Sequence, residues 1–281
     1  MKERILTEEI MKQFRCSLLE EEKSCATVEK YIRDVSAFKA FASNGKICKG
    51  TVIAYKQKLM DRGYAVRSVN SMLASLNSLF RFLNWADCKI KAAKVQRQIY
   101  CSEEKELTKA EYIRLCRAAK EKRNERLYLI LQTICGTGIR VSELKHITVE
   151  AVRRGEAVVS LKGKTRTVFI VKELQKKLLC YAEKRKISTG CIFVTRTGKA
   201  LSRTNIWREM KSLCKAAGVD PKKVFPHNLR HLFARTFYNI EKDIAKLADI
   251  LGHASIETTR IYIISTGAEH RRKMENMRLI L

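Results

Sequence analysis

Apolar residues recur at three- and four-residue intervals along most of this 281-residue chain, a spacing that is typical of one buried helix face. A clear example is the set Val28, Tyr31, Ile32, Val35, Phe38 and Phe41. Only two prolines and twelve glycines interrupt the chain, which favours long helices joined by simple loops. The apolar fraction of 46% is enough for a buried core. We therefore expect a folded, mainly helical protein.

The helical periodicity is lost in one basic stretch, and this break divides the chain. Residues 1–90 are predicted to form a small helical domain, residues 91–105 a basic linker, and residues 106–281 a second domain. The apolar stripes of the first domain are absent from the linker, which begins with clustered lysine and arginine. Two separately folded domains are therefore expected.

The second domain combines helices with a short β segment. Its start is marked by Thr108 and Glu111, which have the spacing of a helix capping box. Residues 157–161 and 165–171 are β-rich runs on either side of a short basic turn, and residues 191–194 predict a further short strand. The predicted fold class is therefore mainly α with a small β-sheet in the second domain.

The charge of the chain indicates its partner. There are 57 Lys+Arg against 29 Asp+Glu, a net charge of +28. Solubility alone requires a net charge of only about 2–8 in a small domain, so solvation is a weak explanation. A folded protein this basic is expected to bind a polyanion, and nucleic acid is the leading candidate.

Several classes of protein are not expected. No run approaches the roughly 20 apolar residues of a membrane span, and the N-terminal residues lack the apolar core of a secretory signal. The ten cysteines include no C-x-x-C spacing and no neighbouring pair of histidines. We therefore expect no metal site, no cofactor and no membrane association, and we expect reduced thiols in a cytoplasmic protein.

One predicted helix has an unusual polar face. The helix expected from about residue 66 to residue 85 has no charged residue between positions 71 and 80. Its polar face carries Ser68, Asn70, Ser71, Ser75 and Asn77. This face is either neutral and solvent-exposed or lies close to DNA, where hydroxyl and amide groups meet phosphates and base edges.

Three clusters in the second domain carry residues suited to phosphate chemistry. Arg140 follows Gly138 at a predicted helix start, where backbone N–H groups can help to hold a phosphate. His227 and Arg230 are three residues apart and therefore share a helix face, and Tyr262 lies about two turns into a later helix. Taken alone, Arg140 is explained as a surface arginine, the segment with His227 and Arg230 as a solvated basic turn, and Tyr262 as a core tyrosine. Together they supply what metal-free phosphoryl transfer requires: cations for the developing charge and a phenol as nucleophile.

These motifs, in this order, resemble those of the tyrosine recombinases of the phage-integrase and Xer type over essentially the whole chain. The resemblance implies a two-domain clamp, with a helical, SAM-like core-binding domain and an α/β catalytic domain. It assigns the catalytic residues as Arg140, His227, Arg230, His253 and the nucleophile Tyr262, with Glu143 and His231 in supporting roles.

The basic turn departs from the family pattern, because it is one residue shorter. Alignment on Lys-Gly makes Lys162 the catalytic lysine, and alignment on the later lysine makes it Lys164; we favour Lys162. Arg166, on the strand after the turn, is predicted to contact DNA.

The resemblance also implies a reaction. Tyr262 forms a 3′-phosphotyrosyl link, and strand exchange proceeds through a Holliday junction on double-stranded core sites. The active form is expected to be a homotetramer on two duplexes, alone or with a second recombinase. Integration or excision of a mobile element and Xer-type dimer resolution remain open roles. The alternatives are a type IB topoisomerase and a non-catalytic DNA-binding regulator on the same scaffold.

Overall fold

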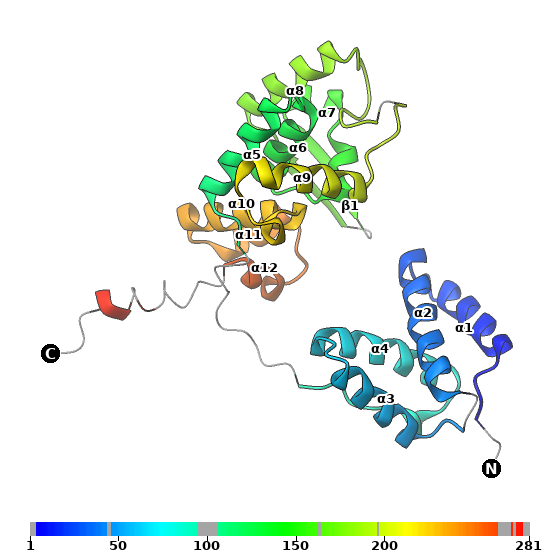
Figure 1. Ribbon diagram of the computed structural model, residues 1–281. Helices are drawn as coiled ribbons and strands as arrows, with labels where there is room; N and C mark the ends of the chain where they lie inside the picture. Colours follow the sequence, from blue (N-terminus) through cyan, green and yellow to red (C-terminus); the bar gives the residue numbers. More distant parts are fainter. Residues whose placement is uncertain are drawn as a thin grey trace. The chain divides into compact units, whose positions relative to one another are not determined.

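The computed structural model describes residues 4–43, 46–94, 106–161, 164–195, 197–263, 271 and 274–277. The chain divides into two compact units, Met1–Arg97 and Gln98–Leu281 (Figure 1). The described residues are mostly helical and contain a single two-stranded antiparallel sheet, so the predicted fold class is confirmed. Within the same residues, no helix combines the length and the apolarity that crossing a bilayer demands.

The described part of the first unit is a bundle whose helices share one core. Its elements are α1 (Glu8–Glu20), α2 (Cys25–Ala42), α3 (Lys49–Asp61), α4 (Val66–Phe82) and the short 3-10 helix η1 (Ala86–Cys88). The side-chain oxygens of Thr7 and Ser24 cap the starts of α1 and α2. The apolar stripe predicted for α2 is confirmed, because Val28, Val35 and Phe38 are all buried.

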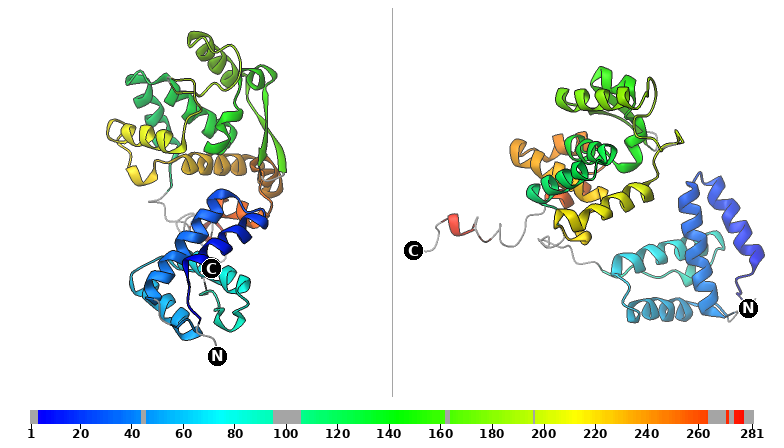
Figure 2. Two further views of the ribbon diagram at one scale, coloured as in Figure 1. Left: turned by 90° about the vertical axis from the view of Figure 1, so that its right-hand side faces the viewer. Right: turned by 45° about the horizontal axis from the view of Figure 1, so that its top comes forward.

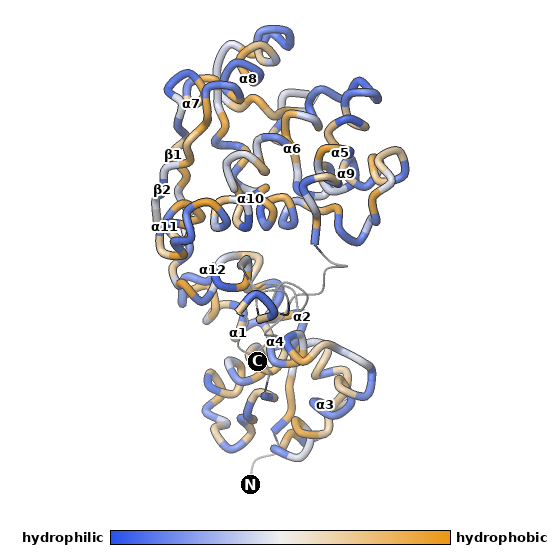
Figure 3. Tube along the Cα trace, turned by 90° about the vertical axis from the view of Figure 1, so that its left-hand side faces the viewer, coloured by the Kyte–Doolittle hydropathy of each residue, from blue (hydrophilic) through white to orange (hydrophobic). Residues whose placement is uncertain are grey.

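The second unit is built around helix α6, which is apolar on nearly every side and is therefore buried. Its helices are α5 (Lys109–Glu121), α6 (Glu125–Thr137), η3 (Val141–His146), α7 (Val149–Arg154), α8 (Lys172–Lys184), α9 (Arg203–Ala217), η4 (Pro221–Lys223), α10 (Pro226–Glu241), α11 (Ile244–Leu251) and α12 (Ile256–Ile263). Helices α5, α8, α9 and α10 all contact α6. In Figure 3, much of the trace of α6 has hydrophobic colouring, whereas much of the trace of α8 is coloured hydrophilic. The capping box predicted at Thr108 and Glu111 is confirmed.

A β-hairpin forms one edge of the second unit (Figure 2, left). Strand β1 (Glu156–Leu161) pairs antiparallel with β2 (Lys164–Phe169), and Val159 lies opposite Arg166. Because side chains alternate along a strand, Arg166 lies on the same face as Val159 and Val168, which are both buried. The face of β2 that carries Arg166 therefore points into the unit, where β2 contacts α11.

Two sequence predictions about strands need correction. Strand β2 ends at Phe169 rather than at Val171, because Val171 takes the N-cap position of α8. The strand predicted over residues 191–194 is wrong, since this segment makes only the isolated bridges Thr148↔Cys191 and Val194↔Ala200. The apolar run at residues 191–194 therefore packs into the core without adding a strand to the β1–β2 sheet.

Candidate active site

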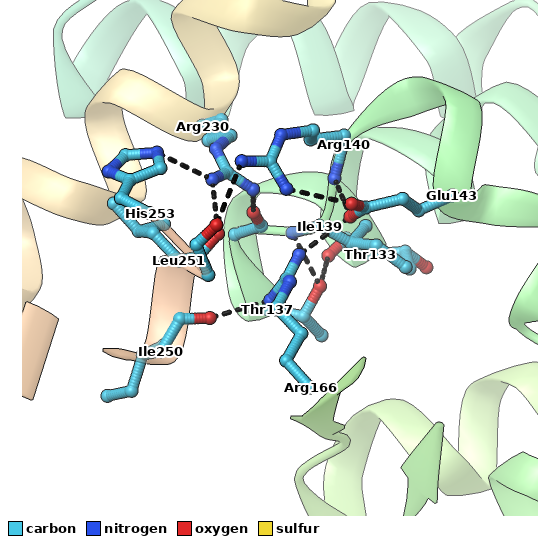
Figure 4. A network of polar contacts seen from close by, with 12 residues as sticks. Thr133, Thr137, Ile139, Arg140, Glu143, Arg166, Arg230, Ile250, Leu251 and His253 are labelled. Atoms are coloured by element: carbon cyan, nitrogen blue, oxygen red, sulfur yellow. Dashed lines mark hydrogen bonds and ion pairs between the residues drawn. The ribbon is translucent and has the colours of Figure 1, made fainter. Parts of the chain in front are cut away.

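Arg140 reaches the site because helix α6 stops abruptly in front of it. Gly138 ends α6 in the left-handed conformation with φ +65°, and a Cβ at this position would collide with the ring of Phe233. Thr137 Oγ1 then accepts a hydrogen bond from Ile139 N at 3.2 Å, which fixes the turn. Figure 4 shows this turn leading directly to Arg140. Gly138 is thus required for both its backbone conformation and its small volume.

Glu143 is the carboxylate that holds two arginines. It is only 2% exposed, and its Oε1 accepts a hydrogen bond from Arg140 Nη1 at 2.8 Å. Its Oε2 accepts from Arg140 N at 2.9 Å and from Arg166 Nη2 at 2.6 Å. Burial raises the pKa of Glu143, but the hydrogen bonds from Arg140 and the charge of Arg166 outweigh it, so the pKa lies below its usual value. Glu143 is therefore ionised at neutral pH.

Arg230 on α10 is almost completely buried, with 1% exposure. Its Nη1 donates to Gly138 O at 2.5 Å and its Nη2 donates to Leu251 O at 2.7 Å. Its Nε is buried and has no hydrogen-bond partner among the described residues. Burial and then the charge of Arg140 lower the pKa of Arg230 to about 10, so the group stays charged at neutral pH. A buried, charged guanidinium attracts an anion more strongly than an exposed one does, because water screens it poorly.

His253 is held in one tautomer by its neighbours. Its Nε2 lies 3.0 Å from Arg230 Nη2, and because arginine only donates, His253 Nε2 must accept. The proton therefore sits on Nδ1, which donates to Thr259 Oγ1 at 2.8 Å. Burial, followed by the charges of Arg230 and Arg140, lowers the pKa of His253 to about 4. The ring is thus neutral at neutral pH.

Tyr262 on α12 is enclosed by imidazole rings. Its side chain is 6% exposed and belongs to a small cluster with Leu247 and Leu251. The centroid distances from the Tyr262 ring are 4.2 Å to His231, 5.2 Å to His253 and 5.4 Å to His227. The hydroxyl lies 3.5 Å from His227 Nε2. The phenol ring is therefore packed, while its oxygen lies beside a group that can accept a proton.

The two histidines of α10 are also unprotonated at neutral pH. Desolvation of its ring, followed by the charge of Arg230, lowers the pKa of His227. Burial lowers the pKa of His231 to about 4, and the neighbouring His227 and Arg230 add to this effect. Neutral His227 is therefore able to take up a proton from the nearby phenol.

The described residues of the site leave positive charge without compensation. Arg140, Arg166 and Arg230 supply three positive charges, and Glu143 supplies one negative charge, which leaves two positive charges beside three neutral histidines. Two of these arginines are mainly buried, so solvent screens them poorly. Such a site favours a bound anion, and the phenol of Tyr262 lies next to it.

Family models match almost the whole chain. The model described as the phage integrase family matches residues 105–269, which is more than half of the chain, and the model of its N-terminal SAM-like domain matches residues 11–87. The chain is a tyrosine recombinase of the phage integrase family. It is an enzyme of the site-specific recombinase class.

Individual proteins that are similar in sequence or structure are also tyrosine recombinases or integrases. The tyrosine recombinase XerA of Pyrococcus furiosus is 30% identical over 292 residues, which cover 100% of this chain and 98% of the relative. The tyrosine recombinase XerD of Halalkalibacterium halodurans is 28% identical over 87% of this chain and 89% of its own. A crystal structure of a XerA recombinase matches 98% of this chain and 100% of its own with a TM-score of 0.54 and 26% identity. The lambda integrase tetramer bound to a Holliday junction has a TM-score of 0.74 over 93% of this chain and 78% of its own; at 18% identity it shows the fold alone.

Most of the predicted catalytic residues of this recombinase, and two of the predicted supporting residues, come together in the structure. They are Arg140, Glu143, His227, Arg230, His231, His253 and Tyr262. Lys162 lies outside the described residues. Lys164 opens β2, but its side chain is not among those described. The choice between the two lysines therefore stays a prediction.

The structure corrects the role that we expected for Arg166. Its side chain is only 11% exposed and is bonded inside the site, to Glu143 and to the carbonyl of Ile250. A DNA contact requires an exposed donor. The sequence analysis placed Arg166 on the strand after the turn but did not show which face of that strand is buried; the two-residue period of β2 turns the Arg166 side chain inward.

The polar face of α4 also needs correction. Ser75 is fully buried and donates to Asp34 Oδ2 at 2.9 Å, so burial removes it from the predicted DNA-facing set. The amides of Asn70 and Asn77 bond both ways with the backbone of Ala93 and Ile90, respectively, and thus hold the segment that follows η1. Two further members of the set, Ser68 and Ser71, are exposed and remain predicted DNA contacts.

One residue of the site was missed in the sequence. Thr259 is fully buried, and its hydroxyl accepts the hydrogen bond from His253 Nδ1, which orients the imidazole. The signal was present, because Thr259 and Tyr262 are three residues apart and therefore share one face of α12. A threonine on the same helix face as a buried tyrosine indicated a polar partner inside the site.

Proposed function

We propose that this recombinase cuts and rejoins DNA through a 3′-phosphotyrosyl intermediate at Tyr262. One observation carries the proposal: the hydroxyl of Tyr262 lies 3.5 Å from neutral His227, and the same ring packs against His253, which contacts Arg230. A nucleophile, a proton acceptor and uncompensated cations are thereby combined. These are the groups that phosphodiester transfer needs.

In the proposed cleavage step, the oxygen of Tyr262 forms a bond to phosphorus and the bond from phosphorus to the 5′-oxygen breaks. His227 accepts the phenol proton, and Lys162 (or Lys164) gives a proton to the departing 5′-oxygen. Arg140 and Arg230 bind the nonbridging oxygens. The phosphotyrosyl ester conserves the bond energy, so rejoining needs neither ATP nor a metal ion in this scheme.

We further propose the assembly that the sequence predicts. The two units act as a clamp on a double-stranded core site, and a homotetramer, alone or with a second recombinase, joins two duplexes through a Holliday junction. The lambda integrase tetramer bound to a Holliday junction, which shares the fold, is an assembly of this kind. The biological role is integration or excision of a mobile element, or Xer-type dimer resolution, in the cytoplasm.

A nicked suicide substrate tests the chemistry, because loss of the short cleaved fragment traps the covalent complex. Core sites are taken from inverted repeats in the DNA that flanks the gene. We expect wild-type protein to form a complex that survives denaturing electrophoresis, with EDTA present, and Tyr262→Phe to bind DNA without forming it.

Two outcomes oppose the proposal. A covalent complex with Tyr262→Phe would exclude this nucleophile, and scission that depends strictly on added magnesium would exclude the scheme. A plasmid that carries two core sites separates recombination from its alternative: relaxation without a recombinant product would indicate a topoisomerase.

A further inference from the structure

We propose that Arg166 is a positioning residue, which locks Arg140 and the turn that carries His253 into one geometry. The inference rests on the catalytic roles proposed above for Arg140 and His253. It assigns to the β-hairpin a part in building the site, in addition to carrying the predicted lysine.

The first contact of Arg166 acts on Arg140. Arg166 Nη2 donates to Glu143 Oε2 at 2.6 Å, and the other carboxylate oxygen accepts from Arg140 Nη1 at 2.8 Å. Because both oxygens of Glu143 are engaged, the carboxylate cannot rotate without losing a charge-assisted hydrogen bond. The guanidinium of Arg140 is therefore oriented by Arg166 through a shared, buried carboxylate.

The second contact of Arg166 acts on the turn between α11 and His253. Arg166 Nη1 donates to Ile250 O at 2.6 Å, at the end of α11. The next carbonyl, that of Leu251, accepts from Arg230, and the carbonyl of Gly252 accepts from Arg140 Nη2 at 3.4 Å. One guanidinium thus connects Glu143 with the turn that precedes His253, as Figure 4 shows.

Gly252 shows how closely Arg166 fits this turn. Gly252 has φ +63°, and a Cβ built there would collide with Cδ and Nε of Arg166. The turn therefore passes directly over the arginine side chain. The Nε of Arg166 is buried and unpartnered among the described residues, so it is not a donor offered to solvent.

The test compares Arg166→Met with a matched control, Arg126→Met. Arg126 lies in the same unit and also joins a carbonyl to a carboxylate, with Nη1 to Val194 O at 3.0 Å and Nη2 to Glu209 Oε1 at 2.8 Å. Neither partner belongs to the site. Both variants lose a similar pair of contacts, so a loss that occurs only in Arg166→Met reports on the site.

The measurement is single-turnover cleavage of the suicide substrate at saturating protein, with DNA affinity measured separately as a function of salt. For Arg166→Met we expect cleavage to slow by about 10²-fold, since small misplacements of catalytic groups have effects of this size. DNA affinity and its salt dependence should stay within about twofold of wild type. Arg126→Met should cleave at nearly the wild-type rate, and Arg166→Lys, which retains the charge and one bond, should be intermediate.

Three results would overturn the inference. Weaker binding and a smaller salt slope with a normal cleavage rate would make Arg166 a phosphate contact. Equal slowing in Arg166→Met and Arg126→Met would reduce it to a general fold contact. A wild-type cleavage rate in Arg166→Lys would show that the forked geometry of the guanidinium is unimportant. Arg166→Lys is also the more conservative variant, and it is the one to use if Arg166→Met does not fold.

A double-mutant cycle tests the route through Glu143. Because Arg166 reaches Arg140 only through Glu143 but holds the turn before His253 directly, Arg166→Met combined with Glu143→Gln should slow cleavage by less than the product of the two single losses. Multiplied losses would contradict this route. Absence of a covalent complex with wild-type protein would instead reject the proposed function, whereas normal cleavage by Arg166→Met would reject only this inference.

Discussion

The imidazole of His231 stacks on the phenol ring of Tyr262, with the ring centroids 4.2 Å apart and the ring planes inclined by 26°. The two residues belong to α10 and α12 and are distant in the sequence. The stack holds the face of the tyrosine ring, while the hydroxyl at its edge lies next to His227. His231 therefore supports the proposed nucleophile by packing.

This stack gives a first prediction. His231→Ala should lower the free energy of unfolding by about 1–2 kcal/mol and slow formation of the covalent complex, because the ring of Tyr262 loses its stacking partner. His231→Phe, which retains an aromatic ring, should recover most of both. Urea unfolding and the suicide substrate measure the two effects. Equal slowing in both variants would mean that the imidazole itself takes part in the chemistry.

Stability should depend on pH through His231 and His253. The pKa of each is about 4 in the folded protein, below the ordinary histidine value near 6.5 that applies to the unfolded chain. As the pH falls below about 6.5 the unfolded chain binds protons first, so the contribution of these two rings to the free energy of unfolding decreases until about pH 4. We expect a loss of roughly 1–2 kcal/mol per histidine, because both rings are partly exposed.

Urea unfolding from about pH 7.5 to about pH 4.5 measures this dependence. His231→Phe removes one of these groups, so its curve should be shallower than that of the wild type over the same range. A variant with the wild-type slope would show that His231 does not titrate as its surroundings indicate.

Glu143→Gln should destabilise the protein strongly. The change removes the carboxylate from Arg140 and Arg166 and leaves their charges uncompensated, which should lower the free energy of unfolding by about 3 kcal/mol. Glu125→Gln is the matched control, because Glu125 forms an exposed ion pair with Lys184 and should change stability by less than about 1 kcal/mol. Chemical denaturation compares the two. A similar small loss in both variants would contradict the central role of Glu143.

The buried hydroxyl of α4 gives a fourth prediction. Ser75→Ala leaves Asp34 without one hydrogen bond, so it should lower the free energy of unfolding by about 1–2 kcal/mol and leave DNA affinity unchanged. Ser68→Ala, at an exposed position of the same helix, should do the reverse: stability within about 0.5 kcal/mol of wild type and weaker DNA binding. Weaker DNA binding by Ser75→Ala at normal stability would restore the original prediction.

Much of the secondary structure was predictable because it depends on neighbours in the sequence. The buried stripe of α2, the capping box at Thr108 and the hairpin all follow from local spacing. The prediction for residues 191–194 failed because an apolar run has no signal for whether a partner strand is present. Ser75 was misassigned for a related reason: its polar partner Asp34 lies on a different helix, 41 residues away.

The sequence alone determined which chemical groups are available and which of them share a helix, since His227, Arg230 and His231 are placed by the helical repeat. Only the tertiary structure decided how these groups act on one another. It brought Arg230 to the carbonyl of Gly138 across 92 residues, and it turned Arg166 from a DNA contact into an internal brace. Such contacts join elements that pack together without being neighbours in the chain, so local periodicity carries no information about them.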